Sequence, residues 1–487
     1  MKSIPYLLVF VLFLFLQPVG AQDGDDDDPE IEIGGDDGDE GRTEEEEEEL
    51  RKTKKKNVGL AGGGKEDDDD ANAPKVKISL QTRINEAIRK GVVWLKKAQK
   101  EDGSWGPVRA NSHYGDSKEK KREMRPKPGE WPYIRDPTGP TSWSIYTLSK
   151  CGVKKSDPVI RKGYKWLQTG KKMLAEGAAE RGQTGQTWGP GKAWDVTGDK
   201  SRHYSSSTYE SASLIMMLEA MYERSAKLTS KHKKRRLDSK NPLKPPSGSK
   251  IPKEDWKWMH DRVVWLTVGR RGKRTIKGTQ NTGGGWRYGQ ANGQADLSST
   301  QFCLLGLRAA SQAGYPVTKV SPNCWLYAAQ YCKSLQLGNG GFGYQKGSGW
   351  NASMTACGVG SLVICREQMQ LANQEVPSWM DSSIEKGLAY LDEVFDADQN
   401  RGEGGGREHH YYLYSVERVG DLTGRTEFAG KNWYVRGAEY LLSHQDADGK
   451  WVQNGFPPHD VLGTCFALLF LKRATPPVVT VSDRDGK

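Results

Sequence analysis

Polar side chains suited to acid–base chemistry recur at one fixed spacing in this sequence. Each lies four residues before a second polar residue, and an apolar stretch follows that second residue. Asp296 precedes Thr300 by this spacing, Asn351 precedes Thr355, and Asp460 precedes Thr464. Carboxylic acids, imidazoles and phenols gathered at one opening could transfer protons or bind a polar ligand. The candidate catalytic residues are His409, His410, Tyr411, Asp296 and Asp460, and the candidate ligand-binding residues are Tyr204, Asn351, His203 and His459.

An alternative reading of these positions is helix capping. Asp and Asn at the start of a helix commonly accept hydrogen bonds from its unpaired amides, which would account for Asp296, Asn351 and Asp460 without a site. The run from His409 to Tyr412 is not typical of a cap. We expect exposed histidines there, whose joint replacement by Ala should impair function while changing stability by no more than about 1 kcal/mol.

Six copies of one helical hairpin must position these residues. The first helix of a copy carries a Gly-x-x-Trp-Leu pattern, as in 91–95 and 163–167, or a Tyr in place of the Trp, as in 387–391 and 437–441. A Gly-rich turn with an aromatic residue follows, most clearly at 99–105 and 445–451. Glycine supplies the left-handed backbone that ends a helix and reverses the chain.

The second helix of each copy is apolar on nearly all sides, as in 356–362 and 461–471, whereas the first helix keeps charged residues on one face. Alternation of buried and amphipathic helices indicates two layers. We therefore predict an all-α fold, an α/α toroid of about six hairpins with inner and outer helices. An open α-solenoid is the alternative, but its repeats are shorter and more even in length.

The two clearest turns, 99–105 and 445–451, resemble the Q-x-x-x-G-x-W repeat of squalene–hopene and oxidosqualene cyclases. Residues 340–344 and 351–355 resemble a repeat of protein prenyltransferase β-subunits. The resemblance covers about residues 79–475 and implies an α/α toroid with a central cavity. It does not fix the activity, because function depends on the site and not on the fold.

The motifs of these families' chemistry do not occur within the repeats. There is no D-x-D-D or D-C-T-A-E cluster to protonate an alkene, and Ser298 follows Asp296 where the prenyltransferase zinc site has a cysteine. We expect neither squalene cyclisation nor zinc-dependent prenyl transfer, and we predict no metal site and no cofactor. The seven cysteines show no zinc-binding spacing.

The segments outside the repeats predict export. Residues 1–21 have the charged start, apolar run and small-residue cleavage site of a signal peptide, which directs a protein to the periplasm or the extracellular space. Residues 22–78 hold acidic and basic blocks and too few apolar residues for a core, so we expect a disordered tether. Residues 476–487 form a short tail.

Charge and fold together suggest the partners. Most of the acidic excess lies before residue 50, so the remaining chain is more basic than the net charge of +10. Such a body could bind an anionic surface; nucleic acid is not expected in an exported protein. The leading hypothesis is binding of a lipid, an isoprenoid or an anionic glycan in the central cavity or at its polar mouth. The alternatives are an enzyme, either a divergent terpenoid cyclase or a lyase or hydrolase of anionic glycans, and an envelope interaction module.

Overall fold

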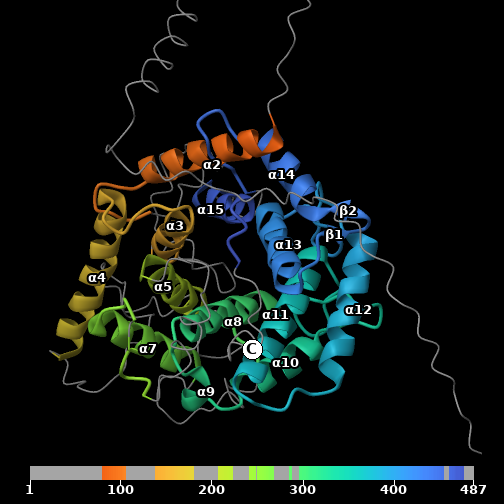
Figure 1. Ribbon diagram of the computed structural model, residues 1–487, viewed down its shortest axis with the longest axis horizontal. Helices are drawn as coiled ribbons and strands as arrows, with labels where there is room; N and C mark the ends of the chain where they lie inside the picture. The colour runs from red at the N-terminus through yellow and green to blue at the C-terminus, as the bar shows by residue number, and fades with distance from the viewer. Residues whose placement is uncertain are drawn as a thin grey trace, which may run out of the picture. The chain divides into compact units, whose positions relative to one another are not determined.

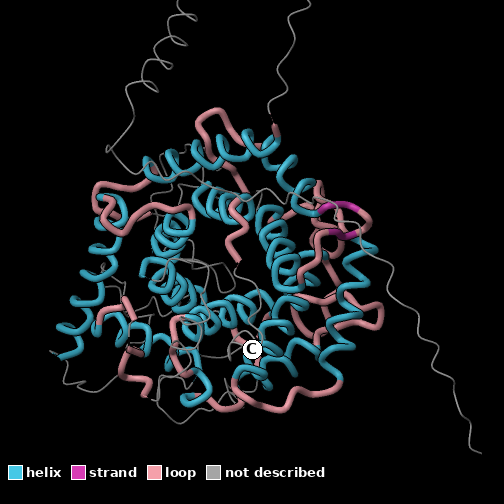
Figure 2. Tube along the Cα trace, in the orientation of Figure 1, coloured by secondary structure: helices cyan, strands magenta, loops and turns pink. Residues whose placement is uncertain are grey.

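The structure is a computed structural model that describes residues 79–105, 138–179, 207–222, 241–247, 249–267, 284–287, 295–453 and 460–475. These residues form thirteen helices and one two-stranded hairpin (Figures 1 and 2). Among them, no helix is both long and apolar enough to cross a membrane. The predicted signal peptide, tether and tail lie outside the described residues.

Six helices form an inner ring. They are α3 (Thr138–Lys150), α5 (Ser207–Tyr222), α8 (Leu297–Gln312), α11 (Ala352–Leu371), α13 (His409–Thr423) and α15 (Asp460–Leu471). Each inner helix packs against the next one along the chain, and α15 returns to pack against α3 (Figure 1). The ring is therefore closed, which confirms the predicted toroid and excludes the open solenoid.

Six further helices form the outer layer. They are α2 (Leu80–Lys97), α4 (Pro158–Ala179), α7 (Lys253–Thr267), α10 (Cys324–Ser334), α12 (Trp379–Val394) and α14 (Trp433–Ser443). The short helix α9 (Val317–Val320) links α8 to α10, and strands β1 (Glu427–Phe428) and β2 (Lys431–Asn432) pair antiparallel before α14. Helix α2 packs against both α14 and α15, so the last hairpin meets the first.

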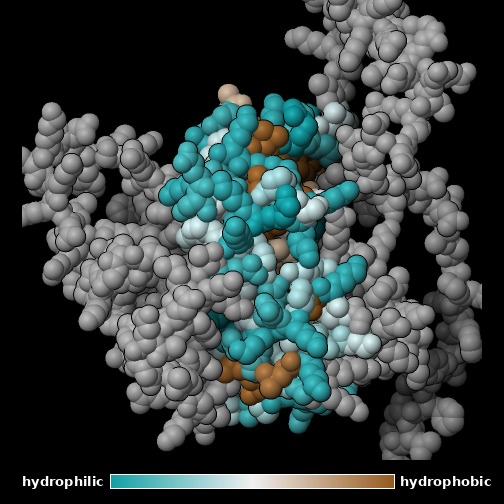
Figure 3. All heavy atoms as spheres, turned by 90° about the vertical axis from the view of Figure 1, so that its left-hand side faces the viewer, coloured by the Kyte–Doolittle hydropathy of each residue, from teal (hydrophilic) through white to brown (hydrophobic). Residues whose placement is uncertain are grey.

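The two layers differ in burial as their sequences predict. Outer helix α2 buries Ile84, Ile88 and Leu95 and exposes Arg89, whereas inner helix α15 is buried along most of its length. Figure 3 shows one side of the molecule, where hydrophilic side chains cover most of the described surface and hydrophobic patches are small. Burial of the inner helices on all sides, at about 25 cal/mol per Å² of apolar surface, is the main force that holds the ring together.

Each repeat turn is tied to both of its helices. The indole nitrogen of Trp105 donates to the Leu95 carbonyl at the end of α2, and its backbone nitrogen donates to Oγ1 of Thr141 in α3. Trp451 repeats both bonds, with Leu441 and Thr464 as acceptors. The aromatic residue of the turn thus locks the end of an outer helix to the first turns of the inner helix that follows.

The glutamine of the turn joins neighbouring repeats. Nε2 of Gln99 donates to the carbonyl of Gly103 in its own turn and to that of Val159 in the next outer helix. Nε2 of Gln445 donates to Gly449 in the same way, and also to the carbonyl of Ala87 in α2. The bond to Ala87 connects the last repeat to the first across the closure of the ring.

Candidate functional site

The N-terminal ends of at least four inner helices meet at one mouth of the ring. The amide of Leu297, at the start of α8, donates to Tyr344, which lies in the segment before α11. The amide of Ala352, at the start of α11, donates to Arg401, in the segment before α13. The Tyr411 amide in α13 donates to Oε1 of Gln453, which precedes α15. The positive ends of these helix dipoles therefore collect at this mouth.

Asp296 and Asn351 lie at this mouth, and both act as caps. Oδ1 of Asp296 accepts from the amide of Ser299 at 2.7 Å, and Oδ1 of Asn351 accepts from the amide of Met354 at 2.7 Å. Asp296 is fully buried and pairs with Nη1 of Arg287 at 2.7 Å. Burial raises the pKa of Asp296 above its ordinary value, although Arg287 and the Ser299 amide oppose the shift.

The expected exposure of His409 and His410 is wrong. Both side chains are buried at the start of α13, and Nε2 of His409 lies 2.9 Å from the Ala397 carbonyl. Burial lowers the pKa of His410 to about 3. Their burial was not predicted from the sequence, because two adjacent polar imidazoles are typical of an exposed position and not of a core. Their joint replacement by Ala is now expected to destabilise the fold by more than about 1 kcal/mol, since buried volume is removed.

Glu408, and not His410, occupies the N-cap position of α13, although its side chain accepts no hydrogen bond from that helix. Its backbone is left-handed, with φ of 54°, and its carboxylate accepts from Nε2 of Gln453 instead of from its own helix. Burial raises the pKa of Glu408 to about 7, with a smaller opposing effect of Arg407. A carboxyl group with a pKa near neutrality is suited to general acid–base work. The repeat register is shifted by two residues in this helix, which is why the sequence reading overlooked Glu408.

The other predicted mouth residues are placed only in part. Asp460 is the first described residue of α15, and its Oδ1 accepts from the amide of Val461 at 3.1 Å. Tyr204, His203 and His459 lie outside the described residues. The structure thus brings Asp296, Asn351 and the start of α13 to one mouth. That Tyr204, His203 and His459 join them there stays a prediction.

Tyr411 joins a group of seven aromatic residues inside the ring, here called the aromatic cluster. Its members are Trp143, Tyr146, Tyr209, Phe302, Tyr411, Tyr414 and Phe466. Trp143 of α3 lies 5.5 Å from Phe302 of α8 and 6.2 Å from Tyr414 of α13, measured between ring centroids. Because neither α8 nor α13 is next to α3 in the ring, these side chains meet at the axis.

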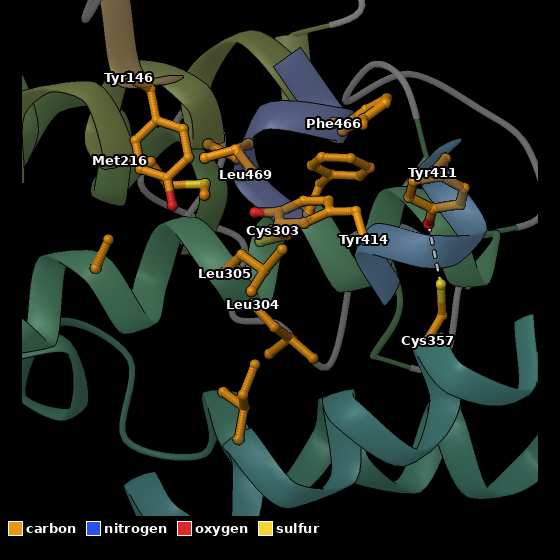
Figure 4. Close-up of a cluster of buried hydrophobic side chains, with 14 of the residues drawn as sticks. Tyr146, Met216, Cys303, Leu304, Leu305, Cys357, Tyr411, Tyr414, Phe466 and Leu469 are labelled. Carbon is orange, nitrogen blue, oxygen red and sulfur yellow. Dashed lines mark hydrogen bonds between the residues drawn. The ribbon is translucent and has the colours of Figure 1, made fainter. Parts of the chain in front are cut away.

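Stacking and edge contacts hold the aromatic cluster together. Tyr414 stacks on Phe466, with 5.5 Å between ring centroids (Figure 4). Phe302 stacks on Tyr411 at 5.8 Å. Trp143, Phe466 and Tyr411 retain 4%, 6% and 7% exposure, whereas Trp105 and Trp451 in the wall are fully buried. The rings are therefore tightly packed, and Tyr209, which is only partly buried, is the most exposed member of the aromatic cluster.

A second group, here called the Arg418 cluster, lies beside the aromatic cluster and consists of Gln301, Cys357, Tyr411, Ser415 and Arg418. Oε1 of Gln301 accepts from the Tyr411 hydroxyl at 2.9 Å, from Nη2 of Arg418 at 2.9 Å, and from the Cys357 thiol at 3.2 Å. Figure 4 shows the 3.0 Å contact between the Cys357 thiol and the Tyr411 hydroxyl. The cluster is therefore a buried polar network anchored on three inner helices.

No group of three or more His, Cys, Asp and Glu side chains within the described ranges is arranged to hold a metal ion. The seven cysteines are free thiols, and six of them are buried. Burial raises the pKa of Cys303 and Cys365 well above the ordinary value for a thiol. These thiols serve as small apolar side chains in the core.

The residues whose side chains lie at the axis occupy one equivalent position in several repeats, and this position could have been identified from the sequence. Trp143, Phe302, Cys357 and Phe466 each follow the mouth-side threonine of their helix by two residues. Tyr414 takes the same position once α13 is counted from its true cap, Glu408. Arg418 has no such signal, because its burial depends on packing against α8.

No family model and no curated protein sequence matches this chain. Among solved structures, the type II terpene cyclase MstE from Scytonema in complex with merosterolic acid A is similar, with a TM-score of 0.39 and 11% identity over 80% of this chain and 97% of that chain. The same cyclase in complex with geranylgeranyl dihydroxybenzoate gives a TM-score of 0.38 and 11% identity over 80% and 96% of the two chains. A wild-type glycosidase gives a TM-score of 0.39 and 13% identity over 81% and 98%.

Proposed function

We propose that this protein binds an apolar ligand, of the lipid or isoprenoid class, against the aromatic cluster at the axis of its ring. The observation that carries the proposal is the convergence of aromatic rings from five inner helices at the axis, where Tyr209 remains partly exposed. Aromatic side chains offer large rigid apolar surfaces, and concave sites lined by them favour apolar ligands. An aromatic lining favours a lipid over an anionic glycan.

Helix α15 offers a matched pair of variants for the test. Phe466 faces the axis beside Trp143 and Tyr414, whereas Phe470, one turn later, packs against Trp433 in the wall. Both side chains are buried, so Phe466→Leu and Phe470→Leu should destabilise the fold to a similar extent. Farnesol binding, followed by quenching of tryptophan fluorescence, should weaken about tenfold or more in Phe466→Leu alone. Equal affinity in the two variants would reject the axis as the binding site.

A second candidate is an acid–base enzyme acting on a glycan at the mouth of the ring. Glu408 favours it, because its partly buried carboxyl has a pKa of about 7, its backbone is left-handed, and its side chain makes no bond to the helix that it begins. Incubation with polygalacturonate or hyaluronan should then release shorter chains, and Glu408→Gln should abolish the release. Absence of products from the wild-type protein with both polymers would remove this candidate.

We also propose that the protein is exported, from the signal-like residues 1–21. The buried free thiols are compatible with an oxidising compartment, because thiols with raised pKa values are poor nucleophiles. Sequencing of the mature protein from its native host should begin at Gln22. Recovery of an intact N-terminus in the cytoplasmic fraction would reject the export.

A further inference from the structure

Arg418 is a buried cation whose hydrogen-bonding capacity is only partly used. The side chain is 1% exposed and lies on α13. Its Nη2 donates to Oε1 of Gln301 and to Oγ of Ser415, each at 2.9 Å. Its Nε and Nη1 have no hydrogen-bond acceptor among the described residues. Two of the three guanidinium nitrogens are thus buried donors without an acceptor.

The two acceptors that Arg418 does have, an amide and a hydroxyl, are uncharged. A guanidinium stays protonated in proteins, and a buried charge without a charged hydrogen-bond partner is unfavourable. The Glu417 carboxyl interacts electrostatically with Arg418, but it accepts its hydrogen bonds from Thr475, and burial raises its pKa well above the ordinary value. Arg308, another buried arginine, does have an anionic acceptor. Its Nε and Nη2 donate to the two carboxylate oxygens of Glu367 at 2.6 and 3.0 Å. The contrast indicates that Arg418 lacks the anionic acceptor that Arg308 has.

The position of Arg418 suggests where that acceptor comes from. Its guanidinium lies over the ring of Tyr414, with 3.9 Å from Cζ to the centroid, and Tyr414 belongs to the aromatic cluster. Gln301, which holds the guanidinium, directly precedes Phe302 of the same cluster. A single positive charge therefore borders the apolar surface at the axis.

We propose that the ligand at the axis is an anionic amphiphile, whose apolar chain lies on the aromatic cluster and whose acidic head group is bound by Nε or Nη1 of Arg418. The inference rests on the proposed function and names its ligand class. Hydrogen bonds between a guanidinium and a carboxylate or phosphate are among the strong ones in proteins. The head group supplies the missing acceptor, and the chain supplies the apolar contact.

The test compares ligands that share one chain and differ in the head group. Wild-type protein is titrated with farnesoic acid, farnesol and acetate at a pH where both acids are ionised, and tryptophan fluorescence is recorded. Farnesoic acid should bind at least about tenfold more tightly than farnesol, and acetate alone should bind far more weakly than either. Acetate binding as tight as that of farnesoic acid would overturn the amphiphile in favour of a free anion.

Variants assign the preference to Arg418. Arg418→Met should remove the preference for the acid while farnesol binding is retained. Arg366, near the C-terminal end of α11, is partly exposed and paired with Asp381, so Arg366→Met should leave the preference intact. Equal affinity of the wild-type protein for acid and alcohol would overturn the anionic head group and leave the apolar site standing. Binding of neither compound would overturn the apolar site itself. The wild-type comparison decides the question even where Arg418→Met does not fold.

Discussion

The two buried arginines of the inner ring should respond differently to loss of charge. Arg308→Met leaves the Glu367 carboxylate buried without its partner, and breaking such a pair costs about 3–5 kcal/mol. Arg418→Met removes a cation whose acceptors are uncharged, and Gln301 keeps its bonds from Tyr411 and Cys357. Urea unfolding should therefore show a clearly smaller loss of stability in Arg418→Met. An equal loss would mean that Arg418 is fully compensated in the free protein.

His410 should give the protein a measurable pH dependence of stability. Burial lowers its pKa to about 3 in the folded protein, against about 6.5 for the unfolded chain. The neutral imidazole therefore contributes stability above about pH 6.5, and this contribution is lost as the pH falls toward 3, by up to about 1.4 kcal/mol per pH unit.

The variant His410→Phe isolates this contribution, because it keeps a ring of similar shape without a titrating group. Chemical unfolding of both proteins between neutral and mildly acidic pH should show the wild type losing stability faster than the variant. Other groups, including Glu408, titrate in both proteins and cancel in the difference. Parallel curves for the two proteins would show that His410 is accessible to protons in the folded state.

At the scale of single elements, the glycine of outer helices α2 and α4 is required by the aromatic residue of a neighbouring turn. A Cβ on Gly91 in α2 would lie 2.7 Å from Cζ3 of Trp451 and 2.9 Å from Cδ2 of Leu468. Gly163 in α4 meets Trp105 at the same distance. The Gly-x-x-Trp-Leu pattern therefore records where two repeats touch, and the pairing of Gly91 with Trp451 joins the first repeat to the last.

Gly91→Ala and Gly139→Ala should have opposite effects on stability. Gly91→Ala overpacks the contact with Trp451 and should cost about 1–3 kcal/mol, reduced in part by the better helix propensity of Ala. A methyl group added at Gly139 in α3 would have no described atom within 4 Å, so Ala there should be neutral or stabilise by up to about 1 kcal/mol. Thermal unfolding measures both, and equal effects would remove the packing explanation of the repeat.

The repeat explains why the fold could be read from the sequence. Glycine, aromatic and glutamine residues recur because each makes the same bond in each well-formed turn, as Trp105 and Trp451 do. The site could not be read in the same way. Asp296 and Asn351 fitted both a cap and a site, and the caps are observed. Arg418 and His410 become informative only through burial, which depends on helices far away in the sequence.

At the scale of the whole molecule, closure of the ring should couple the two ends of the repeat region. Nε2 of Gln445 bonds the Ala87 carbonyl, so Gln445→Leu should loosen α2 as well as its own turn. The loss of stability should be about 1–2 kcal/mol. Hydrogen exchange should show faster exchange of α2 amides in this variant, whereas Gln99→Leu, the equivalent change in the first turn, should affect α4 instead.

An unchanged exchange rate in α2 on replacement of Gln445 would argue against the closed ring. Closure also brings Trp143 and Phe466 together, because α15 must return to α3 for their rings to meet at 5.6 Å. The aromatic cluster is therefore a property of the closed molecule, and an open array of the same hairpins would not form it.

The most direct test of ligand binding at the axis is photo-crosslinking with a diazirine analogue of farnesoic acid, followed by peptide mapping of the adducts. We predict adducts on α3, α8, α13 and α15, near Trp143, Phe302, Tyr414 and Phe466, that are displaced by excess farnesoic acid. Adducts confined to the outer helices, or adducts that farnesoic acid does not displace, would contradict a ligand site at the axis of the ring.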